Sequence, residues 1–156
     1  MTQSPSDPHL LDLGQSWLDR MGAACFADDF ETFAAGISLP FVLVTSGGQM
    51  VQTCITEIRQ GFDTFHEMLR TLHATQMLRL AECVWQVSPQ SLVVAYETQI
   101  LSGGQRVVDP FRSVATLIRS DDGLRAASIV NGLSNRKWPI DVLRVDAPDP
   151  ASQRHD

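Results

Sequence analysis

Few residues able to carry out acid–base chemistry lie among the apolar segments of this sequence, and Asp109 is the strongest candidate. Alternation along the predicted strands puts Asp109 on the same face as Trp85, Tyr96 and Phe111. A desolvated carboxylate in such surroundings is a candidate general base. The alternative is a structural role, because Asp109 and Pro110 form a dipeptide common in turns and bulges, where the Asp side chain bonds nearby backbone.

Two histidines lie beside the apolar stripe of a predicted helix. His66 and His73 are separated by about 10.5 Å along a helix axis, which is too far for two ligands of one metal ion. His66 is either a hydrogen-bonded packing residue or a proton shuttle that points into the domain. The sequence has no H-E-x-x-H motif and no third ligand. We therefore predict no metal site and no cofactor.

A second polar set falls on the other predicted face of the sheet and comprises Glu82, Glu97, Arg112 and Asn131. Two opposed carboxylates repel unless a cation lies between them, and Arg112 is placed to supply it. One interpretation is an anion or substrate clamp; the other is an ion network on the outer face or at a dimer interface. The choice depends on strand register, because a slip of one residue exchanges the two faces. Pro110 is typical of a bulge that causes such a slip.

Length and composition indicate one globular domain. The chain has 156 residues, a net charge of −6 and a pI near 5.0, with 44% hydrophobic residues. The acidic balance argues against nucleic-acid and anionic-membrane partners. Three cysteines without a C-x-x-C motif, and no basic N-terminal stretch, favour a cytoplasmic protein without disulfides. We expect a single domain over residues 9–145, with flexible tails at 1–8 and 146–156.

Apolar periodicity predicts three helices in the N-terminal half and a series of long strands after them. Asp28 is the expected N-cap of the second helix, and Gly47 and Gly48 mark a hairpin before the third. The element order is α-α-β-β-α-β-β-β-β, an α+β domain whose three helices pack on a strongly curved mixed or antiparallel sheet. The helices are expected at 9–26, from 28 to about 37, and 53–73, and the later strands at 77–87, 92–101, 106–119 and 124–133.

Two segments resemble the nuclear transport factor 2-like superfamily, which includes ketosteroid isomerases, scytalone dehydratase and SnoaL-type polyketide cyclases. One is Ser46-Gly47-Gly48-Gln49 before the long third helix. The other is RSVATLIRSDDGLR, from Arg112 to Arg125, which is similar to the family's last two strands and the Asp-Gly turn between them. The resemblance covers about residues 10–134. It implies a cone in which a curved sheet wraps around helices and leaves a pocket at the open end.

The resemblance also implies roles for particular residues. Family isomerases use an inward carboxylate with a tyrosine hydroxyl opposite, which corresponds here to Asp109 and Tyr96. Ser128 and Val130 stand where the family's last strand frequently carries inward histidines. The expected ligand is a small apolar or amphipathic molecule. The candidate catalytic residues are Asp109, Tyr96 and His66, and the candidate ligand-binding residues are Trp85, Phe111, Ser128, Arg112 and Asn131.

Two functions follow as hypotheses. The first is a small-molecule-binding domain that acts as a cofactor-independent isomerase, dehydratase or cyclase through an inward carboxylate. The second is a non-catalytic homodimeric binding or accessory module that uses the outer face of the sheet as its interface. Fold alone does not decide between them, because one fold hosts many functions.

Overall fold

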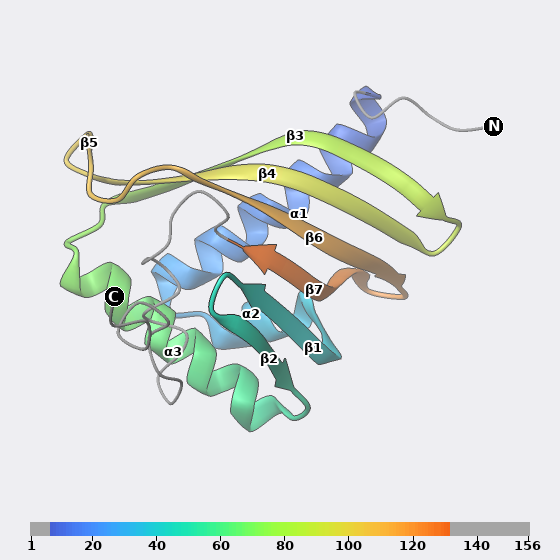
Figure 1. Cartoon of the computed structure of the whole chain (residues 1–156), viewed down its shortest axis with the longest axis horizontal. Coiled ribbons are helices and arrows are strands. Elements are labelled where there is room, and N and C mark those ends of the chain that lie inside the picture. Colours follow the sequence, from blue (N-terminus) through green and yellow to red (C-terminus); the bar gives the residue numbers. More distant parts are fainter. Residues whose placement is uncertain (1–6, 132–156) are drawn as a thin grey trace, which may run out of the picture.

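The computed structural model describes residues 7–131 of the chain, so the predicted C-terminal tail and most of the predicted N-terminal tail lie outside the described residues. Helices and strands follow the predicted order, with one short additional strand (Figure 1). The helices are α1 (Pro8–Ala27), α2 (Phe30–Ala35) and α3 (Ile55–Thr71). The strands are β1 (Ile37–Thr45), β2 (Gly48–Gln52), β3 (Gln76–Ser88), β4 (Ser91–Ser102), β5 (Gln105–Arg106), β6 (Phe111–Ser120) and β7 (Gly123–Asn131).

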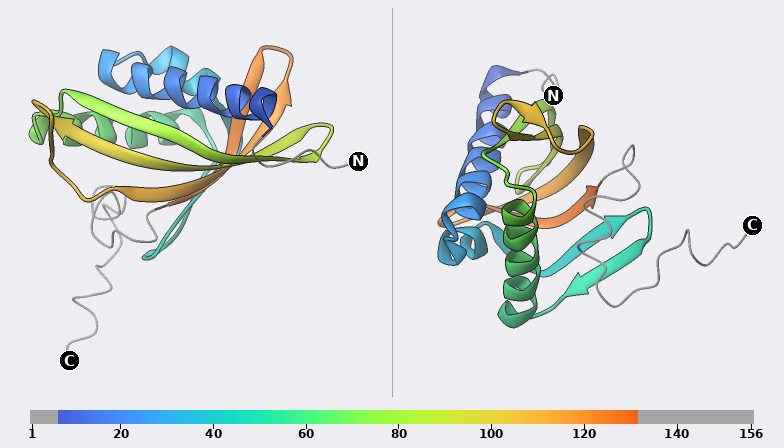
Figure 2. Two further views of the ribbon diagram at one scale, coloured as in Figure 1. Left: turned by 90° about the horizontal axis from the view of Figure 1, so that it is seen from above. Right: turned by 90° about the vertical axis from the view of Figure 1, so that its left-hand side faces the viewer.

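The strands form one mixed sheet in the order β2-β1-β7-β6-β4-β3, and β5 pairs with β4. β1 and β7 are parallel, and the other neighbouring strands are antiparallel. α1 lies across one face of the long strands, and α3 lies between these strands and the β1–β2 hairpin (Figure 2). The predicted α+β class, with three helices on a curved mixed sheet, is confirmed. No helix within residues 7–131 is both long and apolar enough to cross a membrane.

The start of α1 is set by a side-chain cap. The Asp7 carboxylate accepts the backbone N–H groups of His9 and Leu10, at 2.9 and 3.3 Å, and Pro8 occupies the first turn. Pro8, which the sequence placed in a flexible tail, is therefore the first residue of a helix. Further along, a Cβ on Gly14 would lie 2.9 Å from Val84 Cγ2, so this glycine allows α1 to approach the sheet closely.

The connection from α1 to α2 differs from the prediction by one residue. Asp28 is the C-cap of α1 with φ of 55°, in the left-handed region that Asp tolerates better than most residues. Asp29 is the N-cap of α2, and its carboxylate accepts the backbone N–H of Thr32 at 3.2 Å. The predicted N-cap at Asp28 is wrong, because Asp28 ends α1 and the next residue, Asp29, caps the start of α2.

A bulge in β3 exchanges the two faces of that strand. Pairing with β4 shifts between Ala81 and Cys83, so that Val84 faces the core and is fully buried. Trp85 consequently points to the opposite face and is 38% exposed. The prediction that Trp85 shares the face of Tyr96 is wrong for this reason, although Tyr96 itself is buried as expected.

A second irregularity lies between β6 and β7. The pairing shifts between Thr116 and Leu117, after which Ile129 and Asn131 face the helices. Ser128 and Val130, which the sequence placed on that face, alternate with them and point the other way. The predicted strand over residues 106–119 is also interrupted, because β5 ends at Arg106 and β6 begins at Phe111.

Candidate functional site

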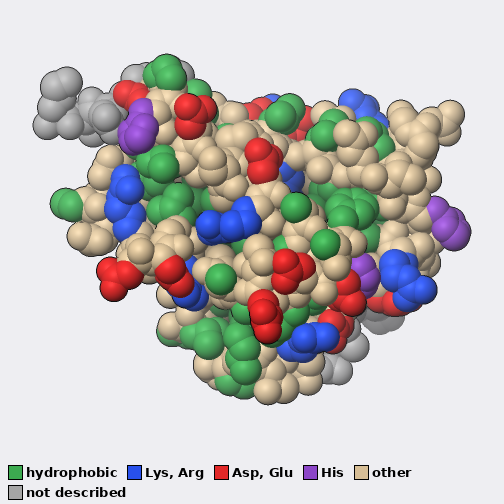
Figure 3. Space-filling model, turned by 180° about the vertical axis from the view of Figure 1, so that it is seen from behind, with side chains coloured by type: hydrophobic (Ala, Val, Ile, Leu, Met, Phe, Trp, Pro, Cys, Tyr) green, Lys and Arg blue, Asp and Glu red, His purple; other side chains and the backbone are tan. Residues whose placement is uncertain are grey.

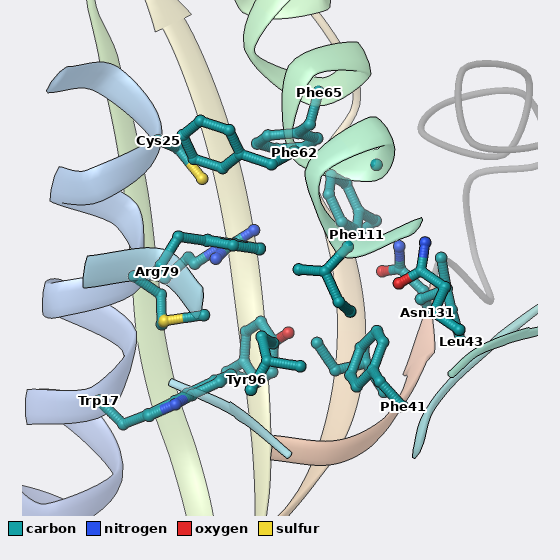
Figure 4. Close-up of a pocket in the computed structure, with 17 residues that line it drawn as sticks. Trp17, Cys25, Phe41, Leu43, Phe62, Phe65, Arg79, Tyr96, Phe111 and Asn131 are labelled. Carbon is teal, nitrogen blue, oxygen red and sulfur yellow. The ribbon is translucent and has the colours of Figure 1, made fainter. Parts of the chain in front are cut away.

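A pocket of about 110 Å³ lies between the helices and the inner face of the sheet (Figure 4). Its wall is mainly aromatic and aliphatic, and its polar side chains are those of Gln52, Arg79, Tyr96 and Asn131. None of the lining residues that the structure describes is an aspartate, glutamate or histidine. The apolar lining residues include Trp17, Met21, Phe33, Ile37, Phe41, Leu43, Ile58, Phe62, Phe65, Phe111 and Ile129.

Trp17 and Phe62 anchor the apolar wall. Trp17 is 2% exposed, and its Nε1–H donates to the Gly36 carbonyl oxygen at 3.2 Å. Phe62 packs against Phe30 and Phe33, with ring centroids 5.4 and 5.0 Å away. Offset and edge-on contacts of this kind are favourable geometries for aromatic pairs. The three helices are therefore tied together directly beside the pocket.

A row of three polar side chains crosses the sheet at the pocket. Tyr96 on β4 is paired with Ser113 on β6, which is paired with Asn131 on β7. Ser113 Oγ donates to Asn131 Oδ1 at 2.5 Å, so the Tyr96 hydroxyl is the donor in its own hydrogen bond to Ser113. All three residues are buried. The row fixes the Tyr96 hydroxyl and leaves the Asn131 amide nitrogen as a donor.

Burial sets the protonation of the two ionisable groups in this wall that have shifted pKa values. Desolvation raises the pKa of Tyr96, and the nearby Arg79 charge and the Ser113 hydrogen bond only partly oppose it. Desolvation likewise raises the pKa of the Cys25 thiol from 9.0 to about 11. At neutral pH the pocket therefore presents a neutral phenol and a neutral thiol.

Arg79 is the one cation among the described lining residues. Its guanidinium carbon lies 5.9 Å from the ring centroid of Phe65 and 5.8 Å from that of Tyr96. Gln15 on α1 holds the strand at this point by donating Nε2–H to the Arg79 carbonyl oxygen, at 2.6 Å. Arg79 also lines a neighbouring groove of about 260 Å³ between α1 and β3. Its side chain thus separates the groove from the pocket.

Asp109, the predicted general base, lies outside the pocket. It is exposed and belongs to the connection between β5 and β6. Asp109 and Pro110 thus lie in an irregular stretch of chain between two strands. Phe111, two residues later, does line the pocket.

His66 is a packing residue. Its Nδ1–H donates to the Cys25 carbonyl oxygen at 2.7 Å near the end of α1, and its ring stacks on Phe62 at 6.3 Å. A carbonyl only accepts, so Nδ1 carries the proton. The imidazole thus ties α3 to α1 and does not line the pocket.

The predicted clamp divides between the two faces of the sheet. Arg112 pairs with Glu82 at 3.1 Å on the outer face, where both side chains are exposed, and Glu97 accepts a hydrogen bond from Gln99. Arg112 thus pairs with one of the two carboxylates, on the outer face of the sheet as the alternative interpretation had it, and the predicted network of both carboxylates does not form. Asn131 alone of the set lines the pocket.

Arg79 and Ile129 are lining residues that the sequence analysis missed. Arg79 alternates with Leu78 and Leu80, and an arginine between two leucines is typical of an outward polar residue on a strand with an apolar inner face. Here the two leucines point outward instead. The available signal was alternation, because Arg79 lies six positions before Trp85 and so shares the strand face that the sequence predicted to point inward.

A curved mixed sheet that wraps around three helices and encloses an apolar pocket defines the nuclear transport factor 2-like fold. The chain has this fold, as the sequence resemblance predicted. No family model and no curated protein sequence gives a significant match to the chain.

Solved structures with the same fold align over most of this chain. A protein from Catenulispora acidiphila has a TM-score of 0.63 at 20% identity, over 85% of this chain and 96% of that chain. An NTF-2 like protein of unknown function from Shewanella oneidensis has a TM-score of 0.57 at 10% identity, over 77% and 96%. A ketosteroid isomerase-like protein from Erwinia carotovora atroseptica has a TM-score of 0.51 at 18% identity, over 80% and 96%. These similarities show the fold alone.

Proposed function

We propose that this chain binds a small, largely apolar molecule in the pocket between the helices and the sheet. The observation that carries the proposal is an apolar cavity into which a few fixed polar groups converge, which is the usual form of a small-molecule site. The volume of about 110 Å³ limits the ligand to a single ring or a similarly small apolar group, since an engineered cavity of about 150 Å³ binds benzene. The Tyr96 hydroxyl and the Asn131 amide would orient its polar group.

Binding is better supported than the predicted isomerase, dehydratase or cyclase chemistry. Such reactions need a group that takes a proton from the substrate. The described lining residues include no carboxylate and no imidazole, and burial keeps Tyr96 protonated. Asp109 and His66 are both engaged elsewhere. We therefore propose that the pocket binds a ligand and does not abstract a proton from it.

Indole N–H signals of ¹⁵N-labelled protein would test this proposal. Trp17 lines the pocket and Trp85 lies on the other side of the sheet, so benzamide should shift the Trp17 signal and leave that of Trp85 in place. Ile129→Trp should abolish the response by filling the pocket. Ser128→Trp, on the opposite face of the same strand, is the matched control and should keep it. A Trp17 signal unmoved by benzamide at millimolar concentration would contradict the proposal.

A second candidate function, homodimerisation through the outer sheet face, rests on the β3 apolar stripe. This stripe consists of Leu78, Leu80, Trp85 and Val87, which all point away from the helices and are all exposed, Leu80 by 54% and Val87 by 59%. Apolar side chains gathered on one strand mark an interaction surface or an aggregation hazard. Figure 3 shows the opposite side of the molecule, which α1 covers, and there acidic and basic side chains are spread between apolar ones.

Sedimentation velocity would test the dimer. We expect the wild type to be dimeric at micromolar concentration, with a melting temperature that rises with protein concentration. Leu80→Glu should make it monomeric, because two charges would be buried without partners. Val51→Glu, at a similarly exposed apolar position on β2, should remain dimeric. A wild type that sediments as a monomer at every concentration would rule the interface out.

A further inference from the structure

The orientation of Arg79 is set by the backbone on both sides of it. Leu78 and Leu80 point outward, so alternation turns Arg79 toward the helices. The Arg79 backbone carbonyl accepts from Gln15 Nε2, and the side-chain Oε1 of the same glutamine accepts the Ala81 N–H at 2.9 Å. One glutamine on α1 thus fixes this stretch of β3 just before the bulge. The guanidinium is held in the pocket wall by the fold.

The positive charge of Arg79 lacks a negative partner within the described part of the chain. The ion pairs there join Arg59 to Asp63, Arg70 to Glu67, Arg112 to Glu82 and Arg125 to Asp122. None involves Arg79. Its Nε–H is fully buried and has no hydrogen-bond acceptor among residues 7–131. Its guanidinium lies over the rings of Phe65 and Tyr96, on which a guanidinium packs favourably but forms no hydrogen bond.

We infer that the pocket selects ligands that carry a carboxylate, and that Arg79 is the residue that recognises it; this inference rests on the proposed small-molecule function. Arg79 is half-buried, but a cation with a buried, unsatisfied N–H and no ion-pair partner is costly, and an anion bound beside it removes that cost. The guanidinium presents parallel N–H groups that match the two oxygens of a carboxylate. Tyr96 beside the guanidinium is neutral and does not repel an anion, and the Asn131 amide nitrogen is a donor in the same wall.

The other residues of the pocket wall indicate which kind of carboxylic acid the pocket would bind. One arginine is the only cation among the described lining residues, which suits a singly charged carboxylate better than a phosphate dianion. Phe62, Phe65 and Phe111 surround the space next to the guanidinium, as Figure 4 shows, and would pack against an apolar ring. The expected ligand is therefore a monocarboxylic acid with a single-ring or similarly sized apolar body.

Benzoate and benzamide form a matched pair of probes, because they share size and shape and differ in charge. Both are titrated against the ¹⁵N-labelled wild-type chain at one ionic strength, with the Trp17 indole signal as readout. We expect benzoate to bind about tenfold more tightly than benzamide. Added salt should weaken benzoate binding and leave benzamide binding unchanged, since it screens charge.

Arg79→Met should remove the preference for benzoate while changing benzamide affinity by less than about threefold. Arg112→Met, which removes the same charge from the outer face, is the control and should keep the wild-type ratio. If Arg79→Met does not fold, Arg79→Lys takes its place and should lower the ratio, because a lysine lacks the paired N–H groups.

Equal affinities of the wild type for the two probes would overturn the inference and leave the proposed function standing. A preference that survives in Arg79→Met, or in Arg79→Lys at the full wild-type ratio, would also overturn it. A Trp17 signal unmoved by either probe would overturn the proposed function and this inference together.

Discussion

Replacement of Trp17 by alanine should lower the free energy of unfolding by about 3–5 kcal/mol, the range for a large aromatic side chain removed from a core. Trp17 is 2% exposed and packs between α1 and the sheet. The substitution also removes the Trp17 hydrogen bond to the Gly36 carbonyl, but this oxygen keeps the Ala126 N–H as a donor at 2.8 Å. The lost packing should therefore dominate. Urea denaturation followed by circular dichroism measures the change.

Trp85→Ala provides the matched comparison. Because the β3 bulge turns Trp85 to the outer face, where it is 38% exposed, the same change should cost no more than about 1 kcal/mol in the monomer. The difference between the two losses in unfolding free energy thus tests whether the bulge turns Trp85 outward. Similar losses at both positions would mean that β3 runs without the bulge and that Trp85 faces the core.

Stability should fall as the pH rises above 9, beginning with the contribution of Cys25. Burial raises the pKa of this thiol from 9.0 to about 11, so between these values the folded chain keeps a proton that the unfolded chain releases. Stability depends on pH through the difference in bound protons, and the state that binds more is penalised as pH rises. Two pKa units correspond to about 2.7 kcal/mol. Ionisation of Tyr96 in the unfolded chain, whose folded pKa is also raised by burial, should add to the loss above pH 10.

Urea titrations at pH 8, 9, 10 and 11 in the presence of a reductant would measure this loss. Cys25→Ala should make the decrease between pH 9 and 11 shallower, whatever its effect on stability at neutral pH. Cys54→Ala, which removes an exposed thiol, is the control and should keep the wild-type slope. A Cys25→Ala slope equal to that of the wild type would contradict the assignment.

Local sequence patterns predicted the elements of the fold well. The apolar spacing from Ile58 through Phe62 to Leu69 marks the buried face of α3, and alternation in β4 places Val94, Tyr96 and Thr98 inward, as the structure has them. These elements are regular over their whole length. In such regular elements the positions of the apolar residues alone show which face of the helix or strand is buried.

The site was predicted less well, because it depends on where regularity breaks. The bulge in β3 and the pairing shift within β7 reverse the faces of Trp85, Ser128 and their neighbours, and neither break carries a proline or glycine to mark it. Tyr96 and Phe111 line the pocket because they lie outside both breaks. The place of Arg79 in the pocket wall also depends on α1, which packs against β3 at this point through Gln15.

The position of β7 constrains the order in which the sheet forms. This strand lies between β6, its neighbour in sequence, and β1, whose partner residue Val44 is some 86 positions away from Val130. Closing so large a loop is slow relative to forming hairpins. Until β7 docks, the facing edges of β1 and β6 stay unpaired, and such edges invite aggregation. Expression yield of this chain should therefore depend most strongly on residues that speed the docking of its last described strand.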